Sequence, residues 1–281
     1  MMNSMLLLIV MGVAAGVLGA ILGIGGGMII TPVLTIMMGL DIKYAIGASI
    51  ISVIATSSGS TIAYLKDDML NLRVAMFLEI ATTVGAIMGA LLVGLFSSNF
   101  LYVLFGFFLL YSTYNMIRKL FDKKGEAVYT QIGPTVQKFK LASTYYDKAE
   151  NKQIDYSMKN IPGGFIMMWA AGLASGLLGI GSGAFKVIAM DTIMKMPLKP
   201  SSATSNLMMG VTAAASATVY FFNGSIRPDI AAPLAIGVLA GATIGARLMQ
   251  VLKPRVIRMI FIPIILYMGV QMALKGFGVN I

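Results

Sequence analysis

The sequence contains no cysteine and no histidine among its 281 residues. Without cysteine the chain has no disulfide and no thiol chemistry, and without both residue types ordinary zinc, copper and haem sites are excluded. Histidine is also unavailable as a proton shuttle. Any function must therefore rest on hydroxyl groups, amides, backbone groups and a small number of charged side chains.

Charged residues are scarce as well, at 11% of the chain, whereas hydrophobic residues make up 58%. The mean hydropathy is +0.86, and a soluble domain typically has about twice this share of charged residues. Several apolar stretches reach the roughly 20 residues that a helix needs to cross a bilayer. The composition predicts an all-α polytopic membrane protein, a multi-pass protein of the inner (cytoplasmic) membrane.

The net charge of +10 is interpreted through this membrane assignment. An excess of Lys and Arg marks cytoplasmic loops in membrane proteins, so it does not indicate binding to nucleic acid. The one long polar stretch, residues 118–160, is rich in lysine and is predicted to be a cytoplasmic linker. Within it, Leu141–Tyr146 and Ile154–Met158 flank a charged turn and favour a small β-hairpin. A mostly unstructured, solvated linker is the alternative.

The two parts of the chain beside this linker repeat one another without gaps at an offset of 156 positions. The matches include four glycine pairs, a lysine pair, a serine pair and two tyrosine pairs: Gly16 and Gly172, Gly23 and Gly179, Gly85 and Gly241, Gly89 and Gly245, Lys43 and Lys199, Ser49 and Ser205, Tyr64 and Tyr220, Tyr111 and Tyr267. Internal duplication is common in secondary transporters. We therefore expect a first transmembrane repeat over residues 1–117, the linker over 118–160 and a second repeat over 161–281.

Each repeat carries a glycine-rich break inside an apolar segment. The first reads Leu22-Gly-Ile-Gly-Gly-Gly27 and the second Leu178-Gly-Ile-Gly-Ser-Gly183. Glycine inside a helix costs about 1 kcal/mol relative to alanine, so each run should interrupt its helix. Backbone that is unwound inside a bilayer must be buried in protein or line a wet cavity. The pattern predicts two Gly-broken helix hairpins, and it leaves open whether they span the membrane or are re-entrant.

Loop charges indicate that the repeats point in opposite directions. The loop at Lys195–Lys199 is more basic than its first-repeat counterpart, Asp41–Lys43. Because basic loops stay in the cytoplasm, equivalent loops should lie on opposite sides of the membrane. We therefore predict inverted-topology repeats with both termini outside the cytoplasm.

Two broken helices from inverted repeats should meet near the membrane midplane, and their free N–H groups carry partial positive charge that attracts an anion. Serine-rich helices that follow each break would add donors. The predicted substrate-binding residues are therefore backbone groups of the breaks and side chains of these helices: Gly25, Gly26, Gly27, Ser49, Ser52, Gly181, Ser182, Gly183, Ser205 and Asn206. The alternative for each hydroxyl is a bond to its own helix.

Ionisable residues at membrane depth are further candidates, because burying a charge is costly. Lys186 lies just after the second break, where the first repeat has Ile30, and we predict that it also binds the anion. Snorkelling to the interface or pairing with Asp191 are its alternatives. Glu79 is a candidate for proton coupling, with an interfacial pair with Arg73 as the alternative.

The sequence contains no motif that indicates an enzyme. The glycine-rich breaks lack the Gly-Lys-Ser/Thr of a phosphate-binding loop, and the absence of His and Cys leaves few possible nucleophiles and bases. We expect no catalytic residue, no metal site and no cofactor. Two plausible intramembrane acids, Glu79 and Asp191, are too few for a typical cation site.

Two motifs resemble a known family of permeases. The run Gly23–Pro32 followed by Ala45–Ser49, and the weaker copy Gly179–Gly183 followed by Ser202–Asn206, are similar to the TauE/SafE sulfite exporter family over essentially the whole chain. The resemblance implies a permease for small organosulfur or carboxylate anions such as sulfite or sulfoacetate. The second copy departs from the pattern at Ser182 and Lys186.

Together these observations predict a secondary transporter that moves a small anionic substrate through the lipid bilayer by alternating access. The sequence does not decide whether a proton or a sodium ion is the coupling ion, and it does not give the oligomeric state. The alternative is a membrane subunit or channel-like scaffold without a transport cycle of its own.

Overall fold

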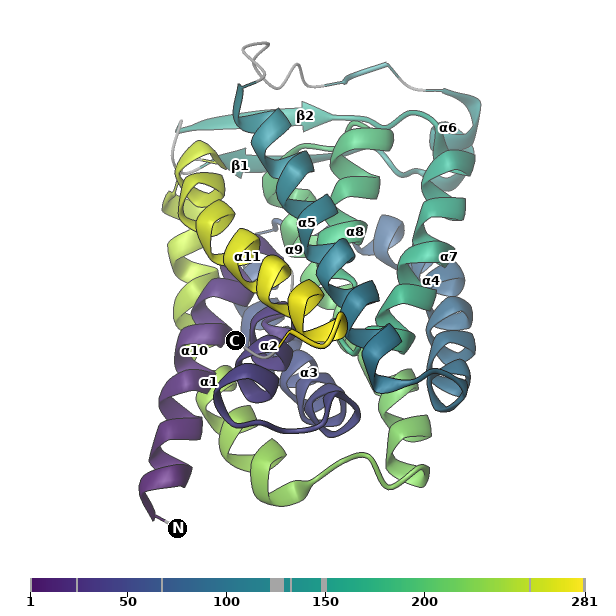
Figure 1. The fold of residues 1–281 in the computed structure, drawn as a ribbon. Helices are drawn as coiled ribbons and strands as arrows, with labels where there is room; N and C mark the ends of the chain where they lie inside the picture. The colour runs from purple at the N-terminus through teal and green to yellow at the C-terminus, as the bar shows by residue number, and fades with distance from the viewer. Residues whose placement is uncertain are drawn as a thin grey trace.

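The computed structural model describes residues 2–23, 25–66, 68–121, 129–131, 133–147, 151–252 and 254–279. Helices dominate these residues (Figure 1). The first part of the chain forms α1 (Met2–Leu22), α2 (Gly27–Met37), α3 (Ile42–Lys66), α4 (Leu72–Leu92), the short 3-10 turn η1 (Val93–Leu95) and α5 (Ser98–Phe121). The polar centre forms α6 (Pro134–Phe139), β1 (Ser143–Asp147) and β2 (Lys152–Tyr156). The last part forms α7 (Ile161–Leu178), α8 (Gly183–Ile188), the π-helical turn η2 (Ala189–Ile193), α9 (Leu198–Phe222), α10 (Pro228–Val251) and α11 (Pro254–Gly276).

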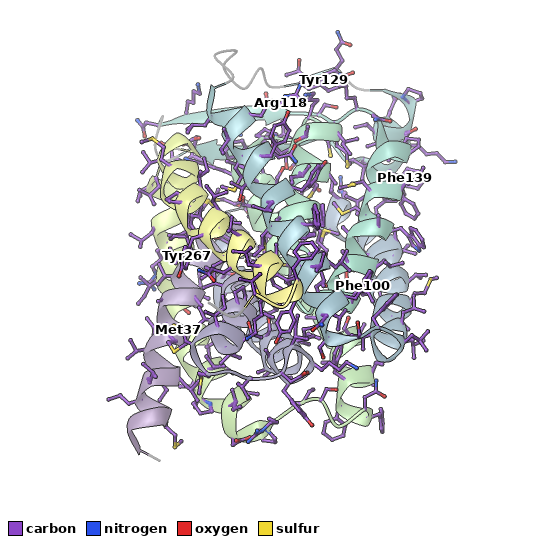
Figure 2. All side chains as sticks on the ribbon, viewed as in Figure 1. Met37, Phe100, Arg118, Tyr129, Phe139 and Tyr267 are labelled. Carbon is purple, nitrogen blue, oxygen red and sulfur yellow. The ribbon has the colours of Figure 1, made fainter. Side chains whose placement is uncertain are left out.

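The helices have the length and surface of membrane helices. Among the described residues, α3, α4, α5, α7 and α10 are each long and apolar enough to cross a bilayer, and shorter apolar helices cover Met5–Ile21, Gly27–Met37 and Phe261–Gly276. Large apolar side chains stand out from the outer faces, including Met37 and Tyr267 (Figure 2). The prediction of an all-α polytopic membrane protein is confirmed, with the two short strands as a small addition.

Both predicted helix breaks are present. Helix α1 ends at Leu22 and α2 begins at Gly27, while α7 ends at Leu178 and α8 begins at Gly183. In the first break Gly23, Gly25 and Gly26 have φ angles of 69°, 79° and 67°, a left-handed region that glycine enters without steric cost. Gly179 and Gly181 do the same in the second break, at 65° and 66°.

Glycine residues lie in the contacts of α4 with α7 and of α1 with α10. A Cβ atom built on Gly85 or Gly89 of α4 would lie 2.2 Å from a backbone carbonyl oxygen of α7. The equivalent glycines of α10, Gly241 and Gly245, approach α1 in the same way, at 2.1 and 2.4 Å. Small residues allow such close helix packing. Gly85 and Gly89 therefore form one such seam and Gly241 and Gly245 the other, and each repeat supplies one helix to each seam.

Equivalent residues of the two repeats lie at opposite ends of the helical bundle. The loop before α3 meets the start of α5, where Ser98 Oγ donates to Asp41 Oδ2 over 3.0 Å. The start of α9 instead lies beside the polar centre, because Lys199 Nζ is 2.7 Å from Asp147 Oδ1. In Figure 1, α1 begins at the end away from the strands and α7 begins at the strand end. How the two repeats are oriented in a membrane stays a prediction.

The predicted β-hairpin is present and packs against the helices. Strands β1 and β2 pair antiparallel with Ser143 opposite Tyr156. Asn71, which caps α4, donates from Nδ2 to Leu141 O over 2.8 Å and to the Tyr156 hydroxyl over 3.3 Å, and burial raises the pKa of Tyr156 to about 12. The charged turn at residues 148–150 lies outside the described residues. The alternative of an unstructured linker is wrong for the strands themselves.

Candidate functional site

The two breaks face each other across the crossing of α3 and α9. A Cβ atom built on Gly25 would lie 2.8 Å from Met209 Sδ, and one built on Gly181 would lie 2.6 Å from Val53 Cγ1. Val53 of α3 and Met209 of α9 are both fully buried and are 156 positions apart, so they are equivalent residues of the two repeats. These two apolar side chains fill the space between the breaks in this conformation.

Two serine hydroxyls tie each repeat to the break of the other. Ser49 Oγ donates to the carbonyl oxygen of Gly179 over 2.8 Å, and Ser205 Oγ donates to that of Gly23 over 2.9 Å. Ser205 Oγ also lies 3.3 Å from Gly183 O. Both serines are completely buried. The sequence predicts them as donors to a solute, whereas here their protons are engaged by the carbonyl groups of the unwound segments.

Replacing Ser49 or Ser205 by alanine is expected to lower the free energy of unfolding by about 1–2 kcal/mol each, because a buried carbonyl loses its partner. Ser58→Ala is the matched control, since Ser58 lies exposed on α3 and its hydroxyl bonds only to Ile54 O of its own helix. Thermal denaturation in detergent would measure the difference. Equal stabilities of the three variants would contradict a structural role for these two cross-repeat bonds.

Of the other predicted side chains, Ser52 forms a hydrogen bond within its own helix and Asn206 forms one with another helix. Ser52 Oγ donates to Ala48 O of its own helix over 3.0 Å, which is the alternative stated for it. Asn206 Nδ2 donates to Ala20 O over 3.2 Å and so reaches the helix before the first break. Ser52 therefore points along α3, and Asn206 belongs to the group around the breaks.

Backbone groups of the first break are partly engaged. The N–H of Gly25 donates to Gly19 O over 3.3 Å, and the carbonyl of Gly26 accepts from Ile29 and Ile30. Gly27 begins α2, and a Cβ atom on it would lie 2.7 Å from Ser49 Oγ. The Gly27 backbone thus lies beside the serine that bonds the second break, so the two unwound segments are adjacent.

Ser182 occupies a position that suits glycine. Its φ angle of 51° matches that of Gly26 in the first repeat, at 67°, although a side chain in this region costs roughly 1–2 kcal/mol. Its hydroxyl is buried and has no hydrogen-bond partner, and the same holds for Asn206 Oδ1. Buried polar atoms in native proteins are almost always bonded. Ser182 Oγ and Asn206 Oδ1 are thus two buried polar atoms near the breaks that lack hydrogen-bond partners.

Lys186 is fully buried and pairs with a residue of α4. Its Nζ donates to Thr212 Oγ1 and lies 3.8 Å from Glu79 Oε2. Glu79 Oε1 accepts from Thr212 Oγ1 over 2.6 Å and from Thr83 Oγ1 over 3.0 Å. The group joins α4, α8 and α9 in the interior.

The alternatives that the sequence left open for Lys186 and Glu79 are not what the structure shows. Lys186 neither reaches toward an interface nor pairs with Asp191, because α8 packs along α9 and directs this side chain inward toward Glu79. Glu79 does not pair with Arg73, whose Nη1 donates to Lys140 O instead. The sequence did not identify Thr212, although its match with Thr56 at the 156-residue offset was an available signal.

Comparisons with known proteins find a transporter family and membrane transporters of similar sequence. A model of the family described as Sulfite exporter TauE/SafE matches residues 8–272. The probable membrane transporter protein YunE of Bacillus subtilis is 26% identical over 280 residues, covering 97% of this chain and 98% of the relative. A probable membrane transporter protein of Methanocaldococcus jannaschii is 26% identical and covers 95% of both chains. No solved structure gives a significant match.

Proposed function

The chain belongs to the TauE/SafE sulfite exporter family, and from this premise we propose that it is a secondary transporter for small organosulfur or carboxylate anions. Sulfite and sulfoacetate are the candidate substrates, and alternating access is the mechanism. The membership and the similar proteins support a membrane transporter, and we expect no enzymatic activity. The proposal adds the substrate, the mechanism and the placement in the inner membrane.

The meeting of the two helix breaks is the observation that carries this proposal. Ser49 and Ser205 join each repeat to the carbonyl oxygens of the opposite break. Unwound backbone is stable at membrane depth only where protein or water covers it, and in transporters such segments form the substrate site at the interface between repeats. The buried, unpartnered hydroxyl of Ser182 supports a bound solute at this place.

The hydrogen-bond donors near the breaks support an anionic solute. The ammonium group of Lys186 is completely buried near the second break, and it is a hydrogen-bond donor without acceptor capacity. Glycine N–H groups at the start of α2 add donors of the same kind. We propose Gly25, Gly26, Gly27, Gly181, Ser182, Gly183, Lys186 and Asn206 as the groups that surround the solute, with Ser49 and Ser205 holding the breaks in place.

The contacts between the two repeats support alternating access as the mechanism. Helix α1 of the first repeat packs on α10 of the second, and α7 of the second packs on α4 of the first. In the proposed membrane orientation, with the strands and residues 118–160 in the cytoplasm, exchanging the conformations of the two repeats would expose the site to the other side. Val53 and Met209 close the space between the breaks in the conformation described here.

The test is counterflow in proteoliposomes that contain only the purified protein. Vesicles loaded with unlabelled sulfoacetate are expected to accumulate labelled sulfoacetate transiently and saturably, and external sulfite should compete. Entry that rises in proportion to concentration without saturation would contradict a carrier. No entry of any of these anions would favour the membrane-subunit alternative.

A further inference from the structure

The buried pair joins Glu79 of the first repeat to Lys186 of the second, and the equivalent residues do not form an ion pair. At the equivalent positions Ile30 replaces the lysine and Ala235 replaces the glutamate, whereas Thr212 has its counterpart in Thr56. Exchanging the two repeats therefore turns the ion pair into an apolar pair, Ile30 of the first repeat and Ala235 of the second, while the threonine is present in both repeats. Packing at this place between the repeats does not require an ion pair, because the equivalent residues are apolar.

The contacts of the pair are incomplete. Glu79 Oε1 accepts two hydroxyl hydrogen bonds, but Glu79 Oε2 is buried without any. The Lys186 ammonium is 3.8 Å away from that oxygen, which is an ion-pair distance and too long for a hydrogen bond. Lys186 can donate three hydrogen bonds, and among the described residues Thr212 is its one hydrogen-bond acceptor. One carboxylate oxygen and part of the ammonium are thus available to other partners.

The other charged side chains on the helices around this pair have partners of their own. Helix α7, which packs along α4, has no ionisable side chain between Ile161 and Leu178. Lys199 of α9 is bound to Asp147 at the far end of its helix, Arg73 of α4 donates to Lys140 O, and Asp191 after α8 has interactions of its own. Within the described residues, Glu79 and Lys186 form a neutral unit in the interior.

We propose that this unit couples anion transport to protons, with Glu79 as the proton carrier. The inference rests on the proposed function and names its coupling ion. When an anion takes Lys186 as its counter-ion, Glu79 is left as an uncompensated buried negative charge, which is costly in this environment. A proton from the compartment to which the site is open then binds Glu79 Oε2 and forms the neutral carboxylic acid. The anion and the proton cross together, and release of the anion restores the ion pair as the proton leaves.

The experiment measures the acid movement that accompanies net entry of sulfoacetate into vesicles that contain none, because the charge of this probe does not change near neutral pH. In proteoliposomes with a trapped pH indicator, wild-type protein is expected to carry about one proton with each anion. Glu79→Gln should reduce the protons carried per anion at least about tenfold, since the amide cannot take up the proton. Asp229→Asn removes an acid that is exposed and paired with Arg227, and this control should keep the wild-type ratio.

A double variant covers the case in which Glu79→Gln does not fold. Glu79→Ala with Lys186→Ile reproduces the apolar residues Ala235 and Ile30 of the equivalent positions, so it should regain the thermal stability that Lys186→Ile alone loses. It should also bind no sulfoacetate and take up no acid. Anion-coupled acid uptake in the double variant, or an unchanged proton ratio in Glu79→Gln, would overturn the inference. Net entry of sulfoacetate through the wild-type protein without acid movement would overturn it and leave the proposed function standing, while absence of both net entry and exchange would overturn both.

Discussion

Leucine at Gly25 or Gly181 is expected to reduce anion flux to the background of empty vesicles. Both glycines have left-handed backbone, at φ 79° and 66°, and a side chain there would meet Val53 and Met209 between the breaks. The added volume occupies the space where the solute is proposed to bind and prevents the breaks from moving past these two residues. Counterflow of labelled sulfoacetate in proteoliposomes measures the effect.

Gly224→Leu separates this effect from backbone strain. Gly224 has nearly the same φ, 67°, but a Cβ atom there has no neighbour within 4 Å. It therefore carries a comparable conformational cost of roughly 1–2 kcal/mol without crowding the site, and its flux should stay close to that of the wild type. Size-exclusion chromatography checks that all three variants fold, and Gly25→Ala and Gly181→Ala give a milder test. Wild-type flux in both leucine variants would remove the solute from the breaks.

Alanine at Gly89 or Gly245 should cause the largest loss of stability. A Cβ atom would lie 2.2 Å from Leu173 O at Gly89 and 2.4 Å from Val17 O at Gly245. Because these neighbours are backbone atoms of packed helices, no side chain can rotate away and the helices must separate. We expect each variant to lose about 3 kcal/mol or more of unfolding free energy.

Gly94→Ala serves as the control for this pair of variants. Gly94 lies in η1, just beyond α4, and a Cβ atom there has open space around it. Thermal denaturation in detergent should give a near-wild-type transition for Gly94→Ala and clearly lower transitions for the other two. If Gly89→Ala unfolded at the wild-type temperature, the close approach of α4 to α7 would not be needed for stability. A similar loss at Gly89 and Gly245 would also show that the two seams are equivalent.

The sequence alone determined the membrane class and the two breaks. These features follow from local chemistry: apolar runs of spanning length form helices, and clustered glycines interrupt them. Helices α1 and α7 end directly before the predicted breaks, and the hairpin was found from two segments that flank a charged turn. Helix α6 was missed because it is short and polar, although Pro134 at its start is a typical helix-initiating signal.

Only the tertiary structure decided which residues of the site meet. Ser49 and Ser205 were chosen for their matching positions, but that each one bonds the opposite break depends on how the repeats pack. Val53 and Met209 could not be singled out, because one buried apolar residue resembles any other in a chain this hydrophobic. The partner of Lys186 was also misjudged, since its nearest acid in sequence is Asp191 and its nearest acid in space is Glu79. Local sequence patterns determine where helices form and where they are interrupted. The partner of a buried charge depends on which helices pack together, and these are distant in the sequence.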